Sequence, residues 1–213
     1  MATTNQRSAR APHAHLPIRR LRRTELPVDT TALARYLIGK TLVREHPTGT
    51  LAGRIVETEA YIVGDAAGHA FRGETPRNRS LFLRRGHAYV YFVYGCWFAV
   101  NVSGEIAGVG AGVLLRALEP IEGVAQMEIH RGTQKLLDLA RGPGRLAMAM
   151  HIDRRLDGVD LCAMGPLWLG TAIRPVGSIG QSVRIGLTRE ALRKLRFFEN
   201  DSRFVSGPGR LRA

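Results

Sequence analysis

Two stretches with the pattern of β-strands constrain this chain most: residues 56–61, with the sequence VETEAY, and residues 89–101, with the sequence YVYFVYGCWFAVN. Side chains alternate between the two faces of a strand, so Glu57, Glu59 and Tyr61 are predicted to share one face. Apolar residues flank the first stretch on both sides and indicate a sheet interior. Burying two carboxylates is costly unless partners or a chemical task compensate them, so either glutamate is a candidate functional acid.

The second stretch predicts a β-hairpin. Residues 89–94 form its first strand, Gly95 permits a reversal, and residues 97–102 form the return strand. Tyr89 and Tyr91 are expected on one face of the first strand, and Tyr94 at the tip. A large aromatic side chain at a tip buries little surface within its own fold, so Tyr94 is a candidate for contact with a partner.

The rest of the pattern mixes further strands with short helices in a single α+β domain. Strands are predicted over residues 41–45, 51–63, 111–119 and 182–187, and helices over residues 30–38, 120–130, 134–140, 145–151 and 188–195. The first two strands make an antiparallel hairpin. Arg116 is expected to share a face with Leu114 and Leu118, and an inward arginine requires an anion. The irregular stretch of residues 64–79 is long enough for a functional loop.

Charge indicates a polyanionic partner. The chain has a formal net charge of +13, and almost all of its basic residues are arginines. Its 213 residues suffice for one domain with a sizeable core. Nucleic acid is the leading candidate, ahead of an anionic membrane surface. Residues 1–24 contain six arginines and no acidic residue, which predicts a basic, disordered arm before a domain of residues 25–213. Such a composition is also compatible with a transit peptide.

Several classes of site are not indicated. The sequence has no phosphate-binding loop, no His-Glu-x-x-His helix, no Gly-x-Ser-x-Gly elbow and no zinc-deaminase signature, so neither a cofactor nor a metal is expected. No apolar run reaches the roughly 18 residues of a membrane span. Cys96 and Cys162 are the only cysteines. They are too few for a disulfide framework, and we therefore expect a cytoplasmic location.

From the residues alone, several readings remain open. A carboxylate, an inward arginine, clustered tyrosines and a basic surface together suit water activation on a nucleic acid. Glu59 could instead form a purely structural ion pair with Arg116, and the whole chain could be a non-catalytic nucleic-acid-binding module. A sugar hydrolase using Glu57 and Glu59 is less compatible, because neighbours on one strand face project alike and cannot flank opposite sides of a bond.

Six motifs in order resemble the alkyladenine (3-methyladenine) DNA glycosylase family. They are ETEAY at residues 57–61, GH at 68–69, TPRNR at 75–79, YVYFVYG at 89–95 with Asn101, LLRALEP at 114–120, and RGPG at 141–144. The similarity extends to RIG at residues 184–186 and LRFF at residues 195–198, and it covers about residues 31–206. Cys96, Trp97 and Leu81 depart from the residues common in that family.

The resemblance implies a single mixed α/β domain around a curved, mainly antiparallel sheet with a protruding β-hairpin. It implies a monomeric, monofunctional glycosylase without lyase activity or cofactor, which flips alkylated or deaminated purines out of double-stranded DNA and hydrolyses the N-glycosidic bond in base excision repair. Glu59 would be the general base, and Arg116 and the carbonyl of Ile185 would hold the water. For Glu57 the residues leave open that it only supports the strand or pairs with a surface arginine, in which case its loss should matter far less than that of Glu59. The other implied roles are base-pocket lining by Tyr61, His69, Tyr91 and Asn101, intercalation by Tyr94, and DNA-backbone contact by Thr75, Arg77, Arg79 and Arg145.

Overall fold

One long strand organises the sheet. The computed structural model describes residues 18–93 and 95–209, and strand β2 (Gly49–Tyr61) crosses its centre. β2 pairs antiparallel with β5 (Gly112–Glu122) along one edge. Along the other edge its first half pairs with β1 (Thr41–His46) and its last residues pair with β8 (Arg196–Glu199). Residues 51–60 are therefore buried without interruption.

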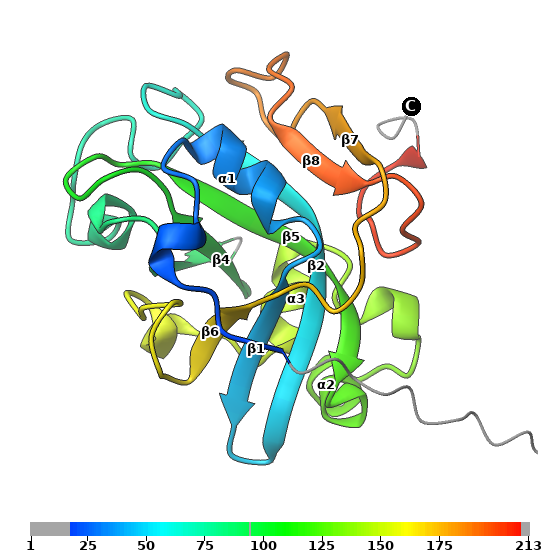
Figure 1. The fold of residues 1–213 in the computed structure, drawn as a ribbon. Helices are drawn as coiled ribbons and strands as arrows, with labels where there is room; N and C mark the ends of the chain where they lie inside the picture. The colour runs from blue at the N-terminus through cyan, green and yellow to red at the C-terminus, as the bar shows by residue number, and fades with distance from the viewer. Residues whose placement is uncertain (1–17, 94, 210–213) are drawn as a thin grey trace, which may run out of the picture.

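The sheet curls into an antiparallel half-barrel (Figure 1). Its strands run in the order β3-β4-β5-β2-β1-β6, with β7 and β8 attached beside β2. The further strands are β3 (Ala88–Val93), β4 (Trp97–Ser103), β6 (Leu167–Gly170) and β7 (Ile179–Ser182). Together with the helices, this confirms the predicted α+β class, the single domain and the mainly antiparallel sheet.

Three α-helices cover this sheet within the described ranges. α1 (Thr30–Leu37) lies across β2 and β5 and begins at Asp29, whose carboxylate accepts a hydrogen bond from the Ala32 N–H (Figure 1). α2 (Val124–Arg131) and α3 (Pro143–Ala149) pack on each other, and α3 also packs on β4 and β5. Short 3₁₀ turns span Arg23–Glu25, Arg79–Phe82, Leu136–Asp138 and Arg154–Leu156.

Several predicted elements differ from the structure. Strand β5 continues to Glu122, so the helix expected at residue 120 begins only at Val124. The helix expected over residues 134–140 is a single 3₁₀ turn, and residues 188–195 contain bends and turns instead of a helix. The strand expected over residues 182–187 ends at Ser182. β6 and β8 were not predicted, because four-residue strands that are buried on both faces show no alternation.

Strict alternation also fails within β2. The register against β5 shifts on both sides of Glu57, as at a β-bulge. Thr58 consequently donates to the Ala34 carbonyl of α1, whereas Val56 packs with Ala117 and Phe198 in a separate small cluster. Val56 and Thr58 therefore do not share a face, although strict alternation along the strand would require it.

The last residues of the predicted arm pack against the folded body. Arg20 forms a bridge with Gly170, the Leu21 N–H donates to the Leu169 carbonyl, and Leu21 is only 1% exposed. Arg19 forms an ion pair with Glu25. The structure thus places residues 18–24 in the domain, and the remainder of the predicted arm lies outside the described residues. Within the described ranges, no helix is both long and apolar enough to cross a membrane.

Candidate active site

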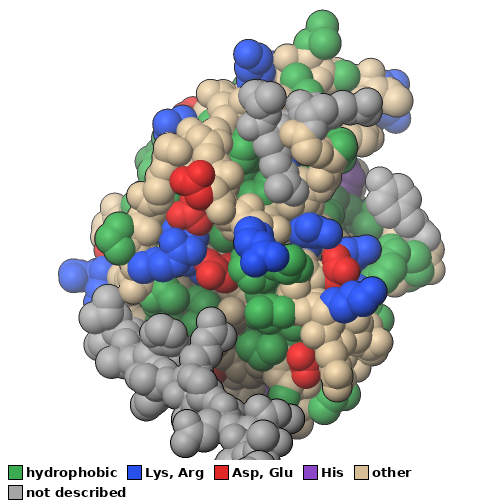
Figure 2. Space-filling model, turned by 90° about the vertical axis from the view of Figure 1, so that its right-hand side faces the viewer, with side chains coloured by type: hydrophobic (Ala, Val, Ile, Leu, Met, Phe, Trp, Pro, Cys, Tyr) green, Lys and Arg blue, Asp and Glu red, His purple; other side chains and the backbone are tan. Residues whose placement is uncertain are grey.

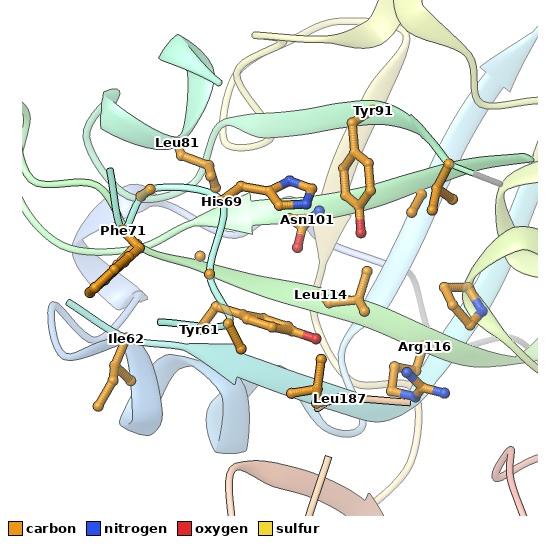
Figure 3. Close-up of a pocket in the computed structure, with 18 of the residues that line it drawn as sticks. Tyr61, Ile62, His69, Phe71, Leu81, Tyr91, Asn101, Leu114, Arg116 and Leu187 are labelled. Carbon is orange, nitrogen blue, oxygen red and sulfur yellow. The ribbon is translucent and has the colours of Figure 1, made fainter. Parts of the chain in front are cut away.

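The predicted base-pocket residues line one cavity. Its volume is about 220 Å³, and its walls come from β2, the loop of residues 64–79, strands β3 to β5 and residues 185–187. Figure 3 shows Tyr61 on one side of this cavity, with His69 and Tyr91 on the other. Asn101 lies between them on β4. Arg116, Ile185 and Leu81, one of the departures from the family's common residues, also line it.

Aromatic rings form the wall opposite Tyr61. The His69 and Tyr91 rings meet edge to face with centroids 4.5 Å apart, and Tyr91 stacks on Tyr89 at 5.2 Å. His69 Nδ1 lies 3.0 Å from the Tyr89 hydroxyl, so the buried Tyr89 supports the wall from behind. Burial raises the pKa of Tyr89 to about 12, which keeps its phenol protonated. Burial, with a smaller contribution from Arg77, lowers the pKa of His69, so its imidazole is neutral near pH 7.

Glu59 is fully buried directly behind the cavity lining. Its Oε1 accepts a 2.8 Å hydrogen bond from the Ile185 N–H and lies 3.2 Å from Arg116 Nη1. Its Oε2 accepts a 3.0 Å hydrogen bond from the Tyr61 hydroxyl. These three partners all line the cavity. The structure therefore brings Glu59, Arg116 and Ile185 together, with the Ile185 N–H on the carboxylate. That Arg116 and the Ile185 carbonyl hold the water stays a prediction.

Glu57 is not paired with a surface arginine, one of the two roles left open for it, because both of its arginine partners are buried. Its Oε1 accepts from Arg116 Nε at 2.9 Å and from Arg196 Nε at 2.7 Å, and its Oε2 accepts from the Ser206 N–H at 2.6 Å. Burial alone would raise the pKa of Glu57, but Arg116 and Arg196 hold it below its ordinary value. Arg116 lies between both glutamates, which raise its pKa against the effect of its own burial.

An arginine without an assigned role supports the cavity from behind. The Arg184 guanidinium lies 4.6 Å from the Tyr61 ring centroid, donates to the Ala60 carbonyl, and forms a fully buried ion pair with Asp65. This pair fixes one face of Tyr61 and leaves the other to the cavity. Sequence reasoning missed it, because nothing in the pattern distinguishes a buried arginine from the many exposed ones.

The loop of residues 64–79 is organised by a second residue that the sequence did not single out. The buried Asn78 accepts hydrogen bonds from the Thr75 N–H and hydroxyl, and it donates to the His69 and Gly73 carbonyls. Thr75, Arg77 and Arg79 are exposed on this loop. The predicted backbone-contact residues Thr75 and Arg77 therefore lie beside the cavity in a neighbouring hollow that His69 also lines.

The RGPG motif attaches α3 to the strand that carries Arg116. The Gly142 N–H donates to the Arg116 carbonyl, Ala117 forms a bridge with Arg141, and Pro143 lines the cavity. Arg145, the fourth predicted backbone-contact residue, is exposed on α3 and forms an ion pair with Asp138. Tyr94, the predicted intercalating residue, lies outside the described residues.

Basic side chains do not form one continuous patch on the face shown in Figure 2. Lys and Arg lie across it with acidic side chains between them. Ion pairs such as those of Asp138 with Arg141 and Arg145 account for part of such mixing. The hollow beside the cavity has a different balance of basic and acidic side chains. Arg72, Arg77 and Arg189 line it, and none of its lining residues is a carboxylate.

Known proteins similar to this chain were found in two comparisons. The family model of methylpurine-DNA glycosylase (MPG) matches residues 24–203. A protein of Mesorhizobium japonicum with the name "Putative 3-methyladenine DNA glycosylase" is 63% identical over 91% of this chain and 92% of its own length. Proteins with the same name from Paraburkholderia phytofirmans and Methanoculleus marisnigri are 53% and 45% identical, over 92% and 84% of this chain and 92% and 94% of their own lengths. The chain thus belongs to the methylpurine-DNA glycosylase family, as the resemblance predicted, and is a DNA repair enzyme that hydrolyses N-glycosidic bonds in DNA.

Proposed function

We propose that this glycosylase flips an alkylated or deaminated purine out of duplex DNA into the cavity between Tyr61 and the His69–Tyr91 wall, where Glu59 activates the attacking water. The observation that supports this most is the buried Glu59 carboxylate, whose three hydrogen-bonding or ionic partners all line an aromatic cavity. At about 220 Å³, the cavity is smaller than the roughly 300–1,000 Å³ typical of drug-sized ligands. A single nucleobase is a ligand of suitable size.

Aromatic walls suit a purine methylated at N3 or N7. Such a base is cationic, and the faces of Tyr61 and Tyr91 can attract it by cation–π interactions of about 0.5–2 kcal/mol each. Because a cationic purine leaves as a neutral base, its departure requires little acid catalysis. The neutral His69 imidazole beside Tyr91 adds no opposing charge.

The chemical step that we propose is hydrolytic. Water approaches C1′ from the edge of the cavity lined by Arg116 and Ile185, and Glu59 accepts its proton. The new C1′–O bond forms as the N-glycosidic bond breaks, and the bonding electrons leave with the purine. Arg116, 3.2 Å from Glu59, balances the charge of the Glu59 carboxylate. The hydrogen bonds from the Tyr61 hydroxyl and the Ile185 N–H fix the orientation of this carboxylate. The three lysines lie outside the cavity lining, so we expect no amine nucleophile and no lyase step.

Flipping requires a further set of contacts. We propose that Tyr94 fills the gap in the stack and that Thr75, Arg77, Arg79 and Arg145 bind backbone phosphates. Extrusion of a nucleotide costs a few kcal/mol, and one aromatic stack of about 1–3 kcal/mol offsets much of that cost. The proposal takes the protein to act as a cytoplasmic monomer on double-stranded DNA.

The test is single-turnover incubation with a duplex that carries one N-methylated purine. We expect free methylated base and an intact strand with an abasic site, and no release from the matched undamaged duplex. Absence of base release at saturating protein would contradict the proposed substrate. Strand cleavage without added base or amine would contradict the hydrolytic, lyase-free step.

A further inference from the structure

We infer that His46, His130 and His151 form a binding site for a divalent transition metal, with Zn²⁺ as the expected ion. His46 is the last residue of β1, His130 lies in the last turn of α2, and His151 lies two residues beyond the end of α3. One ligating nitrogen of each lies within 4.8 Å of the others, and the ring centroids are 4.8 to 5.2 Å apart. None of the three lines the base cavity, so this is a separate site.

The donor set suits zinc. Three neutral imidazoles and one open position for water are a frequent zinc arrangement, and imidazole also accepts copper and nickel. With Zn–N bonds of about 2.0–2.1 Å, tetrahedral ligand nitrogens lie about 3.4 Å apart. His46 Nε2 and His151 Nδ1 are 2.8 Å apart, and the widest separation in the triad is 4.8 Å. To bind one ion, the closest pair of nitrogens would have to separate and the widest pair to approach, by rotation of the side chains.

Contacts around the rings prepare one of the ligand nitrogens, that of His130, and orient a second, that of His46. His130 Nδ1 lies 2.9 Å from the Ala149 carbonyl, which can only accept, so Nδ1 carries the proton and Nε2 carries the lone pair. A ring N–H donated to a backbone carbonyl is the usual outer contact of a metal-binding histidine. His46 Nδ1 accepts from the Thr48 N–H at 3.3 Å and contacts the Thr48 hydroxyl at 2.7 Å, so Nε2 carries the proton and faces His151 Nδ1 at 2.8 Å. Metal binding through Nε2 would displace this proton. The Gln126 amide, 2.9 Å from His130 Nε2, would be displaced by the ion.

The backbone at His151 is unusual. His151 has a φ of 49°, in the left-handed region that few residues other than glycine adopt. Its N–H donates to the Met148 carbonyl and closes the end of α3, and the Ile152 N–H donates to the Ala147 carbonyl. A residue keeps this backbone conformation only when the surrounding structure stabilises it. At this turn, the conformation places the exposed His151 imidazole in contact with the His46 ring.

An ion can reach the triad from solvent. His130 and His151 line another hollow of about 450 Å³, together with Cys96 and Trp97 from the β3–β4 hairpin. The nearby Asp153 carboxylate is held by Arg155 at 2.6 Å, so we do not include it among the ligands. The fourth position is therefore assigned to water.

Metal binding would connect β1, α2 and α3 at one corner of the domain. α3 starts at Pro143 on the lining of the base cavity, but its other end carries the metal site. The expected effect is greater stability of this corner, with base excision by the metal-free protein unchanged.

Titration of the full-length protein with Co²⁺ and then Zn²⁺ tests the site. We expect visible d–d absorption from Co²⁺ that saturates at one equivalent per chain, displacement by Zn²⁺, and a rise in Tm with Zn²⁺. His46→Gln, His130→Gln and His151→Gln should each weaken Co²⁺ binding at least tenfold and remove the Tm rise. His151→Gln is the decisive variant, because the exposed His151 contributes least to packing.

Matched controls distinguish this site from the other histidines. His69→Gln in the base cavity, His87→Gln, and the double variant His13→Gln/His15→Gln should retain one-equivalent binding. Single-turnover excision without metal should be the same for His151→Gln as for the wild type. The inference is overturned if Co²⁺ shows no saturable binding, or if saturable binding survives His151→Gln or is lost in the controls.

Discussion

The two buried glutamates differ in their partners, and their glutamine variants should differ accordingly. Glu59→Gln keeps the shape of the side chain and an oxygen acceptor but removes the proposed base. Excision should fall by roughly 10²–10⁴-fold, equally for cationic and neutral lesions, because both require the activated water. The measurement is single-turnover excision at saturating enzyme, with binding to lesion DNA retained. A near-normal rate would remove Glu59 as the base.

Glu57→Gln is the matched comparison and should mainly affect stability. It leaves the fully buried Arg196 without its carboxylate partner. Breaking a buried ion pair typically costs about 3–5 kcal/mol, and we expect the lower end because Ser182 and the Ser206 carbonyl still bind Arg196. Urea denaturation measures the loss. If Glu57→Gln folds normally and loses as much excision as Glu59→Gln, both carboxylates act in the chemistry.

Acid should destabilise the protein partly through Glu57. Its folded pKa is depressed by Arg116 and Arg196, so its contribution to stability is present above the unfolded pKa of about 4.3 and is lost as pH falls through the folded pKa. We expect the urea midpoint to decline below about pH 4 and the decline to be shallower in Glu57→Gln. Glu25→Gln, which alters an exposed ion pair, should change the profile less. Identical profiles for the wild type and Glu57→Gln would contradict the assignment.

The sequence located the residues of the site better than their contacts. Alternation along one strand correctly put Glu59 and Tyr61 together, and an inward Arg116 correctly required an anion. Arg196 could not be foreseen, because its strand β8 reaches Glu57 from 139 residues away in sequence. The role of Arg184 could not be foreseen either. Its guanidinium stacks on Tyr61 and pairs with Asp65, and both contacts depend on the tertiary fold.

Among the elements, long or capped ones were predicted and short buried ones were not. α1 was recognised because Asp29 caps it and its apolar residues repeat at helical spacing. The four-residue strands β6 and β8 are buried on both sides. The β-bulge near Glu57 has no glycine or proline to mark it, because residues 55–58 are IVET. The contacts that define β6, β8 and the β-bulge join residues far apart in the sequence. The pattern of neighbouring residues contains no information on such contacts.

The β3–β4 hairpin should separate cavity lining from insertion into DNA. Tyr91→Ala removes the ring that contacts His69 and Tyr89, so excision should fall and Tm should decrease. Tyr94→Ala should weaken flipping, measured by fluorescence of a base analogue at the lesion, and leave Tm unchanged. If Tyr94→Ala lowers Tm as much as Tyr91→Ala does, the placement of Tyr94 at the hairpin tip is wrong.

For the whole molecule, the excess positive charge must be assigned to particular surfaces. Arg54, Arg184 and Arg196 are buried and paired with Glu199, Asp65 and Glu57, so they cannot contact phosphate. Exposed arginines lie instead on the loop beside the cavity, at positions 72, 77 and 79. We infer that this side of the folded body, more than the N-terminal segment, dominates non-specific DNA binding.

Two N-terminal truncations test that inference. Deletion of residues 1–17 removes only Arg7 and Arg10 among the arginines. If each arginine neutralises one phosphate, the slope of log Kobs against log salt should flatten by at most about 1.8, with Tm and single-turnover excision unchanged. Deletion of residues 1–24 also removes the buried Leu21 and the Arg23–Asp160 ion pair, so Tm should fall as well. The matched charge control is Arg77→Gln/Arg79→Gln in the full chain, which should flatten the slope by the full amount for two phosphate contacts, about 1.8, and thus by more than the deletion of residues 1–17, without loss of Tm. Loss of most of the salt dependence on deletion of residues 1–17 would show that the N-terminal segment, and not the arginine-bearing loop beside the cavity, carries the main contact with DNA.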